Sequence, residues 1–349
     1  MTAPVRIAVA GSGLIGRRHI EEIDASSTAQ LAAVVDPGPA AAEVADRFGV
    51  PLYPSLRGLL DAEKPDGIIL ATPNQLHVDL GLECVAAGVP VLVEKPIGDT
   101  VQGATKLVEA AEAAGVPLLT GHHRNYSPIM ATAREIVQSG VLGSIVAVVG
   151  TALFYKPDDY FDVGDGWRRQ PGGGPILLNL IHEVNNLQSL VGDVVRVQAT
   201  TSSATRGFPV EDTAAMVFTF AGGALGTFLL SDTAASPRSW EQTSQENTSY
   251  AAYPDEDCYH LAGTQGSLSV PTMRLRVFRG SRSWWEPFES TTVDLQRSDP
   301  LANQVAHFAA VIRGEVEPLC TGRDGLKTLQ VVEAVVESAR TGQPVDLHP

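Results

Sequence analysis

Three glycines near the start of the chain have a spacing that suits contact with phosphate groups. Gly11, Gly13 and Gly16 form the pattern G-x-G-x-x-G directly after the apolar run Val5–Ala10. In such a strand–turn–helix unit the first glycine permits a tight turn, the second leaves room for a pyrophosphate, and the third lets the helix pack on the strand. The helix start also attracts negative charge. We therefore predict dinucleotide contacts from Gly11, Ser12, Gly13, Leu14, Ile15 and Gly16.

A carboxylate at the end of the next apolar run indicates which dinucleotide binds. Asp36 follows the run 30–35, about twenty residues after Gly16. A carboxylate in this place hydrogen-bonds the adenosine ribose hydroxyls. Pro37 comes next, and no arginine or lysine stands there to pair with a 2′-phosphate. The sequence therefore predicts NAD as the cofactor and disfavours NADP.

Lys95 stands just after the apolar strand 89–93, at a sheet end where the nicotinamide of such a cofactor is expected. Hydride transfer from a carbinol carbon needs a group that takes the hydroxyl proton and a donor that holds the developing alkoxide. Burial or a positive nicotinamide lowers the pKa of a lysine from its usual value of about 10.4. We predict a role for Lys95 in proton transfer; the alternative is a surface lysine paired with Glu94. The sequence does not decide whether the Lys95–Pro96 bond is cis.

The elements that position these groups alternate as strands and helices, a pattern typical of a doubly wound parallel sheet. Strands are expected at 5–10, 30–35, 67–71, 89–93 and 116–120, and helices at 40–48, 76–87 and 100–114. Ligands of such sheets lie beyond the carboxyl ends of the strands, so the polar clusters 72–77, 94–96 and 121–126 are site candidates. Besides the glycine turn, the residues expected at the cofactor are Asp36, Thr72, Pro73, Asn74, His77, Glu94 and Lys95. For His77, a place beside the start of a helix is the alternative.

The pattern changes near Pro128, so we expect a Rossmann domain at 1–122 and a second, α+β domain at 123–349. Its strands are expected at 144–153, 194–201, 213–220, 224–231, 267–270 and 274–278, in a mostly antiparallel sheet. Helices are expected at 130–139, 175–191, 301–313 and 325–341, and the last two could pack on the first domain. The polar stretch 231–252 predicts a long surface loop that meets substrate or a neighbouring subunit.

Composition narrows the class of protein. The 349 residues include 25 basic and 40 acidic side chains, and the net charge of −15 speaks against nucleic acid and anionic membranes as partners. The three cysteines are far apart and form no C-x-x-C, and no apolar stretch is long enough for a membrane span. We expect a cytoplasmic protein with a small-molecule substrate that carries a hydroxyl or carbonyl group. His182-Glu183 begins a zincin-like motif, but Asn186 replaces the second histidine, so no metal is predicted.

Several motifs follow one another along the chain: the glycine turn, Ala71-Thr72-Pro73 with Asn74 and His77, Glu94-Lys95-Pro96, Gly121-His122-His123-Arg124, Trp167-Arg168, and Gly172-Gly173-Gly174 with His182 eight residues on. Their combination is a resemblance to the Gfo/Idh/MocA family of NAD(P)-dependent oxidoreductases. It implies that Lys95 and His182 form a catalytic pair for proton transfer. It also implies that an open face of the second sheet forms a homodimer or homotetramer. Without the resemblance, His182 among Leu180, Ile181 and Val184 would equally suit a buried core histidine.

The chain departs from the family pattern at Leu178, four residues before His182, where dehydrogenases of the inositol type carry an aspartate. The nearest polar residue, Asn179, is expected on a different side of the helix. Residues expected to bind substrate are His123, Arg124, Asn125, Tyr126, Trp167, Arg168, Asn179 and His182, and Tyr155, Lys156 and Tyr160 are further candidates from the same loop as Trp167. Arg124 would equally serve as a structural ion pair.

Three functions are consistent with these features. The first is NAD-dependent oxidation of a secondary hydroxyl on a cyclic polyol or sugar-like substrate. The second is oxidation of a cis-dihydrodiol of an aromatic acid, because Leu178 is apolar and Arg168 and Arg169 could hold a carboxylate. The third is a non-catalytic, NAD-binding regulatory protein, which the missing aspartate would suit.

Overall fold

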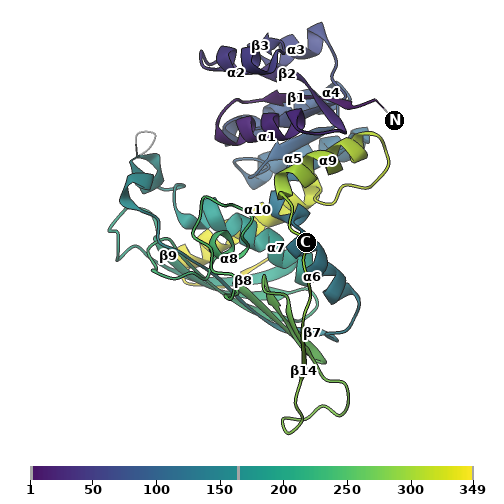
Figure 1. The fold of residues 1–349 in the computed structure, drawn as a ribbon. Coiled ribbons are helices and arrows are strands. Elements are labelled where there is room, and N and C mark those ends of the chain that lie inside the picture. Colours follow the sequence, from purple (N-terminus) through teal and green to yellow (C-terminus); the bar gives the residue numbers. More distant parts are fainter. Residues whose placement is uncertain (1–2, 163–165, 348–349) are drawn as a thin grey trace. The chain divides into compact units, whose positions relative to one another are not determined.

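The computed structural model describes residues 3–162 and 166–347, which form two compact units (Figure 1). The first unit comprises Met1–Ser127 and Ser298–Leu329, and the second comprises Pro128–Arg297 and Gln330–Pro349. No helix in the described part of the chain has the length and apolar character needed to cross a membrane.

The first unit contains a six-stranded parallel sheet with the order β3-β2-β1-β4-β5-β6. Its strands are β1 (Val5–Ala10), β2 (Ala29–Val35), β3 (Leu52–Tyr53), β4 (Gly67–Leu70), β5 (Val91–Glu94) and β6 (Leu118–Gly121). These strands consist mainly of apolar residues because the sheet is covered on both faces. In β4, for example, all four residues are buried. This order confirms the predicted doubly wound fold, and the chain changes direction between β1 and β4, where such sheets bind ligands.

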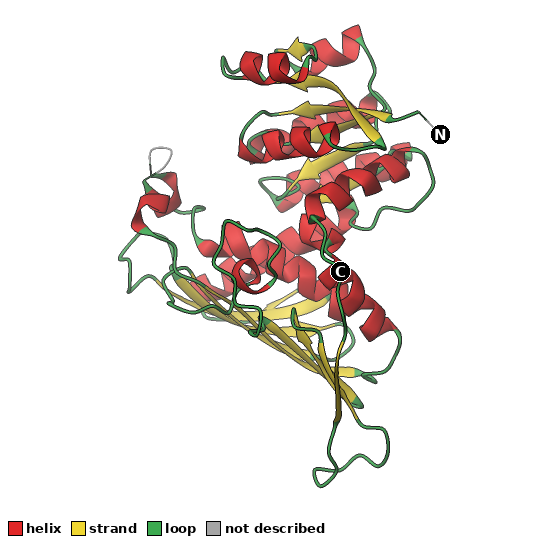
Figure 2. Ribbon diagram, in the orientation of Figure 1, coloured by secondary structure: helices red, strands yellow, loops and turns green. Residues whose placement is uncertain are grey.

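Helices cover both faces of this sheet (Figure 2). They are α1 (Leu14–Asp24), α2 (Ala41–Phe48), α3 (Leu56–Ala62), α4 (His77–Ala86), α5 (Val101–Ala114) and α9 (Pro300–Ile312). Successive residues of β1 belong to opposite faces: Ile7 packs in a cluster with α1, α2 and α9, whereas Ala8 packs in a cluster with α3, α4 and α5. The short elements β3 and α3 were not predicted from the sequence.

The second unit is built on a nine-stranded sheet with the order β14-β13-β12-β11-β7-β10-β9-β8-β15. The strands are β7 (Ile145–Leu153), β8 (Val194–Ser202), β9 (Thr213–Phe220), β10 (Leu225–Ser231), β11 (Tyr259–Gly263), β12 (Gly266–Val270), β13 (Arg274–Val277), β14 (Glu289–Thr292) and β15 (Val345–Asp346). Every pair is antiparallel except β7 with β10, as the predicted class requires. The sequence did not predict β11, β14 or β15.

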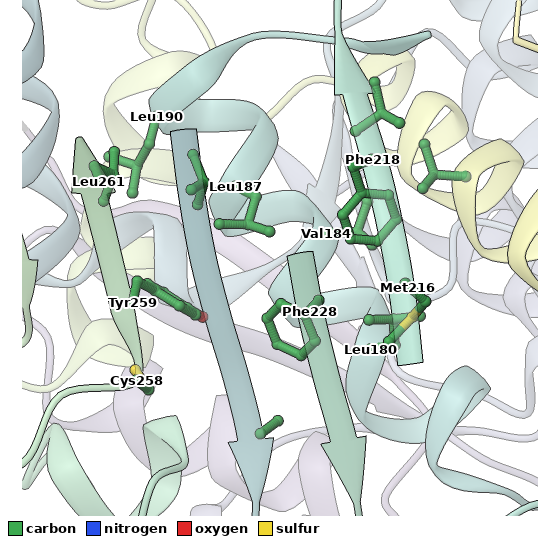
Figure 3. Packing of buried hydrophobic residues seen from close by; sticks show 14 of the residues in the cluster. Leu180, Val184, Leu187, Leu190, Met216, Phe218, Phe228, Cys258, Tyr259 and Leu261 are labelled. Atoms are coloured by element: carbon green, nitrogen blue, oxygen red, sulfur yellow. The ribbon is translucent and has the colours of Figure 1, made fainter. Parts of the chain in front are cut away.

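One face of this sheet forms the core of the second unit. Helices α6 (Pro128–Gln138), α7 (Ile181–Val191) and α8 (Trp240–Thr243), with the later part of α10 (Gly322–Thr341), pack on it. Figure 3 shows Val184 and Leu187 of α7 facing Phe218 and Phe228 from β9 and β10. The opposite face is not covered in the described chain, and it exposes Val149, Val217, Leu225 and Leu229 at 40–56%.

The helix predicted at 175–191 has two parts. Residues Ile176–Leu180 form a π-helical turn, and α7 begins at Ile181. The prediction that Asn179 lies on a different side of the helix from Leu178 assumed an uninterrupted α-helix, whereas a π-helical turn changes the angular spacing of its side chains.

The prediction of a surface loop at 231–252 was wrong in part. This stretch contains α8, and Ser239, Trp240, Thr243 and Ser244 are buried. Ser239 caps α8 by accepting a hydrogen bond from the backbone of Gln242. Trp240 packs with Tyr259 of β11, so one aromatic residue anchors an otherwise polar segment to the core.

Candidate cofactor and active sites

The glycine turn of the first unit has the geometry of a phosphate cradle. Gly11 has φ +94°, and a Cβ on it would lie 2.4 Å from the carbonyl oxygen of Ala71. A Cβ on Gly16 would overlap the Gly11 carbonyl, so α1 can approach the turn only with glycine there. Above Gly13 there is open space, and no described side chain caps α1. The free N–H groups at this helix start fit a pyrophosphate.

Asp36 is held at the end of β2 by hydrogen bonds. Its Oδ2 accepts from the backbone and the hydroxyl of Ser12, both at 2.7 Å, and its Oδ1 accepts from the backbone of Gly38 at 2.7 Å. Burial alone would raise the pKa of Asp36, but these hydrogen bonds and the charge of Arg17 lower it. Asp36 is therefore an oriented carboxylate, which suits ribose hydroxyls. Arg17 was missed as a neighbour of Asp36 because it lies on α1.

Lys95 follows β5 and is partly buried, and its peptide bond to Pro96 is cis. Its backbone N–H donates to Glu94 Oε2 at 3.1 Å, and Glu94 Oε1 lies 2.8 Å from Nε2 of the buried His19. Burial would raise the pKa of Glu94, but the hydrogen bond with His19 and the charge of Lys95 lower it. Both carboxylate oxygens of Glu94 thus fix the start of the Lys95 loop.

His77 joins the loops that follow β4 and β5. Its ring is buried, with Nδ1 2.7 Å from the Pro96 carbonyl oxygen and Nε2 2.9 Å from that of Thr72. The imidazole therefore spans the two loops that carry Thr72 and Lys95. The predicted cluster after β4 is held in place by this residue.

The cluster after β6 forms a short 3₁₀ helix, His123–Tyr126. Arg124, Asn125 and Tyr126 are buried, and the Tyr126 carbonyl accepts from Asn303 Nδ2 at 3.0 Å. Burial, with the charge of Lys95 next in size, lowers the pKa of the neighbouring His122 to about 3. Burial and Arg124 lower the pKa of His123 to about 4. Both imidazoles are therefore neutral at pH 7.

In the second unit, His182 lies in the first turn of α7 and is 8% exposed. The next residue, Glu183, is fully buried and accepts a hydrogen bond from the hydroxyl of Tyr259. That hydroxyl in turn accepts from Asn186 Nδ2 at 3.0 Å. Glu183 and Asn186 thus belong to a network that fixes α7 on β11. Among the described residues, no group of histidine, cysteine and carboxylate side chains is arranged to hold a metal ion.

The loop after β7 brings Lys156 to Asn179. Lys156 Nζ donates to Asn179 Oδ1 at 2.6 Å, although Lys156 is only 5% exposed. Burial lowers the pKa of Lys156 to about 8 against the attraction of Asp232 and Glu241. No partner was predicted for Lys156, because the contact joins residues 23 positions apart.

Trp167 and Arg168 lie in a 3₁₀ turn, Trp167–Arg169, in the same loop. Trp167 is 44% exposed, and the Arg168 guanidinium lies 4.2 Å from the Tyr160 ring centroid. Arg169 pairs instead with Asp162. Gly173 packs on this turn, since a Cβ on it would lie 2.4 Å from the Trp167 carbonyl oxygen.

Sequence reasoning also missed one buried ion pair and one partly buried carboxylate. Arg206 Nε donates to Asp232 Oδ1 at 2.9 Å, and both side chains are more than nine-tenths buried. Glu211 Oε1 accepts from the backbone N–H of Ile176 at 3.0 Å, next to Gly174, where a Cβ would collide with it. Arg206, Asp232 and Glu211 belong to no recognisable sequence motif, so only their contacts in the structure identify them.

Taken unit by unit, the predicted residues gather at two places. In the first unit, the glycine turn, Asp36, Thr72, His77, Glu94 and Lys95 follow the carboxyl ends of β1, β2, β4 and β5, neighbouring strands of one sheet. In the second unit, Lys156 contacts Asn179, which precedes His182 by three positions. Lys156 and Arg168 both lie against the ring of Tyr160.

Comparison with known families matches both units. Residues 5–122 match a family described as oxidoreductases with an NAD-binding Rossmann fold, and residues 130–269 match the GFO/IDH/MocA C-terminal domain. The predicted NAD cofactor is thereby confirmed.

Relatives are similar along almost the whole chain. The rhizopine catabolism protein MocA of Rhizobium meliloti is 26% identical over 344 residues, covering 95% of this chain and 94% of that protein. Inositol 2-dehydrogenase of Rubrobacter xylanophilus is 26% identical over 353 residues, covering 97% and 92%. A crystal structure of an Agrobacterium radiobacter oxidoreductase in complex with NAD⁺, L-tartaric acid and magnesium has a TM-score of 0.81 at 22% identity, covering 99% and 98% of the chains.

Proposed function

We propose, from the premise that this chain belongs to the Gfo/Idh/MocA family of NAD-binding oxidoreductases, that it oxidises a secondary hydroxyl of a cyclic polyol or sugar-like substrate. Inositol 2-dehydrogenase among its relatives supports this substrate class. Residues 1–122 bind NAD in this proposal, and residues 123–349 supply the substrate-binding domain.

The observation that carries the proposal is the placement of Lys95. It follows β5, beside the change of chain direction between β1 and β4, where doubly wound sheets bind their ligands. Its backbone is fixed by Glu94, and His77 holds the carbonyl of Pro96 next to it. A lysine held in this way is preorganised for a reacting group.

In the proposed reaction, Lys95 and His182 take part in transfer of the hydroxyl proton. The O–H proton passes to Lys95 or His182 as the carbonyl forms, and the other of the two stabilises the developing negative charge on oxygen. NAD⁺, when bound, would supply the acceptor for the hydride of the carbinol carbon. Asp36 and the glycine turn bind the adenosine and pyrophosphate parts of the cofactor.

We further propose that the uncovered sheet face forms a homodimer or homotetramer. Val149, Val217, Leu225 and Leu229 alternate with buried residues of β7, β9 and β10 and present an apolar surface. The cytoplasm is the proposed location, in keeping with three cysteines that are buried and form no disulfide bond.

The test is a substrate panel read by nicotinamide absorbance. Inositols and hexoses are offered with NAD⁺ beside carboxylated cis-dihydrodiols, and the carbonyl products are offered with NADH. Turnover of an inositol or a hexose is expected. Turnover of the dihydrodiols alone would replace this function with the second candidate, and NAD binding without turnover of any compound would leave a regulatory protein.

A further inference from the structure

Lys156 is a buried cation whose described partner is a neutral group. Its ammonium donates to the amide oxygen of Asn179 and lies 5.5 Å and 4.8 Å from the ring centroids of Phe154 and Tyr160. It forms no ion pair with a carboxylate in the described ranges 3–162 and 166–347. Lysines are rarely buried without a charged partner, because removing the ammonium from water is costly.

Asp232, a buried carboxylate that attracts Lys156, already has another cationic partner. Asp232 pairs with Arg206, which also donates to the backbone carbonyls of Asp232 and Lys156. Asp232 and Glu241 attract Lys156 from a longer distance, and Arg168 and Arg206 repel it. The positive charge on Lys156 is therefore not neutralised by a direct contact.

Arg168 is a second cation beside the same aromatic ring. Its guanidinium lies 4.2 Å from the Tyr160 ring centroid, and Nη1 donates to the Tyr160 carbonyl at 3.0 Å. Its buried Nε has no hydrogen-bond partner among the described residues. Gly173 approaches the backbone of Arg168, with a Cβ position 2.6 Å from Arg168 Cα, so the turn that carries this arginine is fixed. Arg169 differs, because Asp162 already neutralises it.

Lys156 is linked to the helix that carries the proposed catalytic histidine of the same unit. Asn179, which accepts from Lys156, belongs to the π-helical turn that continues into α7, and His182 is three residues further on. A group bound by Lys156 is thus held within about one helical turn of His182.

We propose that Lys156 and Arg168 bind a carboxylate of the substrate, so that this enzyme acts on an acidic, sugar-like compound such as a sugar acid. The inference rests on the proposed function and deepens it. An ammonium and a guanidinium that both retain donors form charge-assisted hydrogen bonds with a carboxylate, and these are stronger than bonds to a neutral hydroxyl. The planar guanidinium matches the two oxygens of a carboxylate, and the Lys156 ammonium supplies a further charged donor.

The proposal is tested with substrates that differ in one group. The full-length protein with NAD⁺ is offered D-glucuronate, D-glucose and D-glucose 6-phosphate, and also D-galacturonate with D-galactose. We expect kcat/KM for a uronate to exceed that for the matching neutral sugar by at least about tenfold. Equal use of the acid and the neutral sugar would overturn the proposal, and preference for the phosphate would replace the carboxylate with a phosphate group.

Substitutions test the contributions of Lys156 and Arg168 one at a time. Lys156→Met and Arg168→Met are each expected to lower kcat/KM for the uronate by about 10- to 100-fold and that for the neutral sugar by less than about threefold. Arg279→Met is the control: Arg279 belongs to the same unit, is exposed and pairs with Glu289, so its replacement should leave both values unchanged. Lys156→Arg should restore part of the preference. Equal losses with acid and neutral sugar would show a merely structural role, and the affinity for NAD⁺ checks that each variant is folded.

A binding measurement keeps this inference separate from the proposed reaction. The NADH-loaded protein is titrated calorimetrically with D-glucuronate and with D-glucose. If no sugar is oxidised but the uronate binds the wild type and not Lys156→Met, the carboxylate site stands and the proposed reaction fails. If the uronate binds no more tightly than glucose, the carboxylate site is refuted whatever the enzyme oxidises.

Discussion

His19 and Glu94 join two motifs that are 75 positions apart. His19 lies on α1, which begins at the glycine turn, and Glu94 immediately precedes Lys95. The pair therefore connects the cofactor cradle with the proposed proton-transfer lysine. Removing His19 would leave a buried carboxylate oxygen of Glu94 without this hydrogen bond, which typically costs at least about 1–3 kcal/mol.

At Asp36 the structure predicts a change of cofactor preference. Asp36→Ala removes the acceptor expected for the ribose hydroxyls, so kcat/KM with NAD⁺ should fall at least about tenfold while that with NADP⁺ falls less or rises. The ratio of the two constants, measured with one substrate, checks this. Ser12→Ala is the control, because it removes one hydrogen bond to Asp36 and keeps the carboxylate. An unchanged ratio in Asp36→Ala would contradict the ribose role.

At His122 the structure predicts a contribution to acid sensitivity. Burial holds its pKa at about 3 in the folded protein, below the usual value near 6.5, so the unfolded chain binds a proton first as the pH falls. The free energy of unfolding should therefore decrease below about pH 6.5, by about 2 kcal/mol for this residue between about pH 7 and about pH 5.

His122→Asn removes this titration and should lose about 2 kcal/mol less than the wild type over the same pH interval. Urea unfolding at the two pH values measures the difference. Identical losses in variant and wild type would show that His122 is protonated in the folded protein or does not differ from the unfolded chain.

Local motifs explain which site residues the sequence could predict. Gly11, Gly13, Gly16 and Asp36 lie within one strand–turn–helix–strand segment, so their spacing alone locates them. The contact between Lys156 and Asn179 depends on how a long loop folds back on a helix, which spacing does not encode.

Among the elements, α8 was missed because the composition of its segment is polar. The stretch 231–252 is rich in serine, threonine and glutamine, so its overall polarity predicted a surface loop. The large apolar side chain of Trp240 nevertheless anchors this segment to the core: it is 3% exposed and packs against Tyr259. The short strands β3, β14 and β15 were missed because two to four residues give no periodic signal, and β14 is exposed throughout. Longer apolar strands such as β1 and β9 were predicted nearly to the residue.

Trp240→Ala is expected to lower the free energy of unfolding by about 3–5 kcal/mol, because it leaves a cavity between α8 and β11. Denaturant unfolding measures the loss. Trp284→Ala provides the control: Trp284 is 89% exposed, and its removal should change stability by less than about 0.5 kcal/mol. Equal effects of the two substitutions would mean that the 231–252 segment is not anchored to the core.

For the whole molecule, the sequence predicted two different sheets and the structure has both. On the uncovered face, β9 and β10 expose Ala215, Val217, Leu225 and Leu229 beside one polar residue, Thr227, and an isolated chain would leave these apolar side chains in water. We expect this face to be buried between copies of the chain.

Leu229→Lys should convert the assembly to monomers, because a lysine in an apolar interface loses its hydration without gaining a partner. Light scattering during size-exclusion chromatography gives the mass of each form. Val316→Lys, at a valine that is 45% exposed in the first unit, should keep the wild-type mass. A monomeric wild type would contradict the interface.

The most direct test of the proposed chemistry is turnover in Lys95→Met, with NAD⁺ affinity measured on the same preparation. If Lys95 transfers a proton, kcat should fall by about 10²- to 10⁴-fold while the Kd for NAD⁺ changes by less than about threefold. Undiminished turnover, or a loss of NAD⁺ binding as large as the loss of turnover, would show that Lys95 does not act on the substrate.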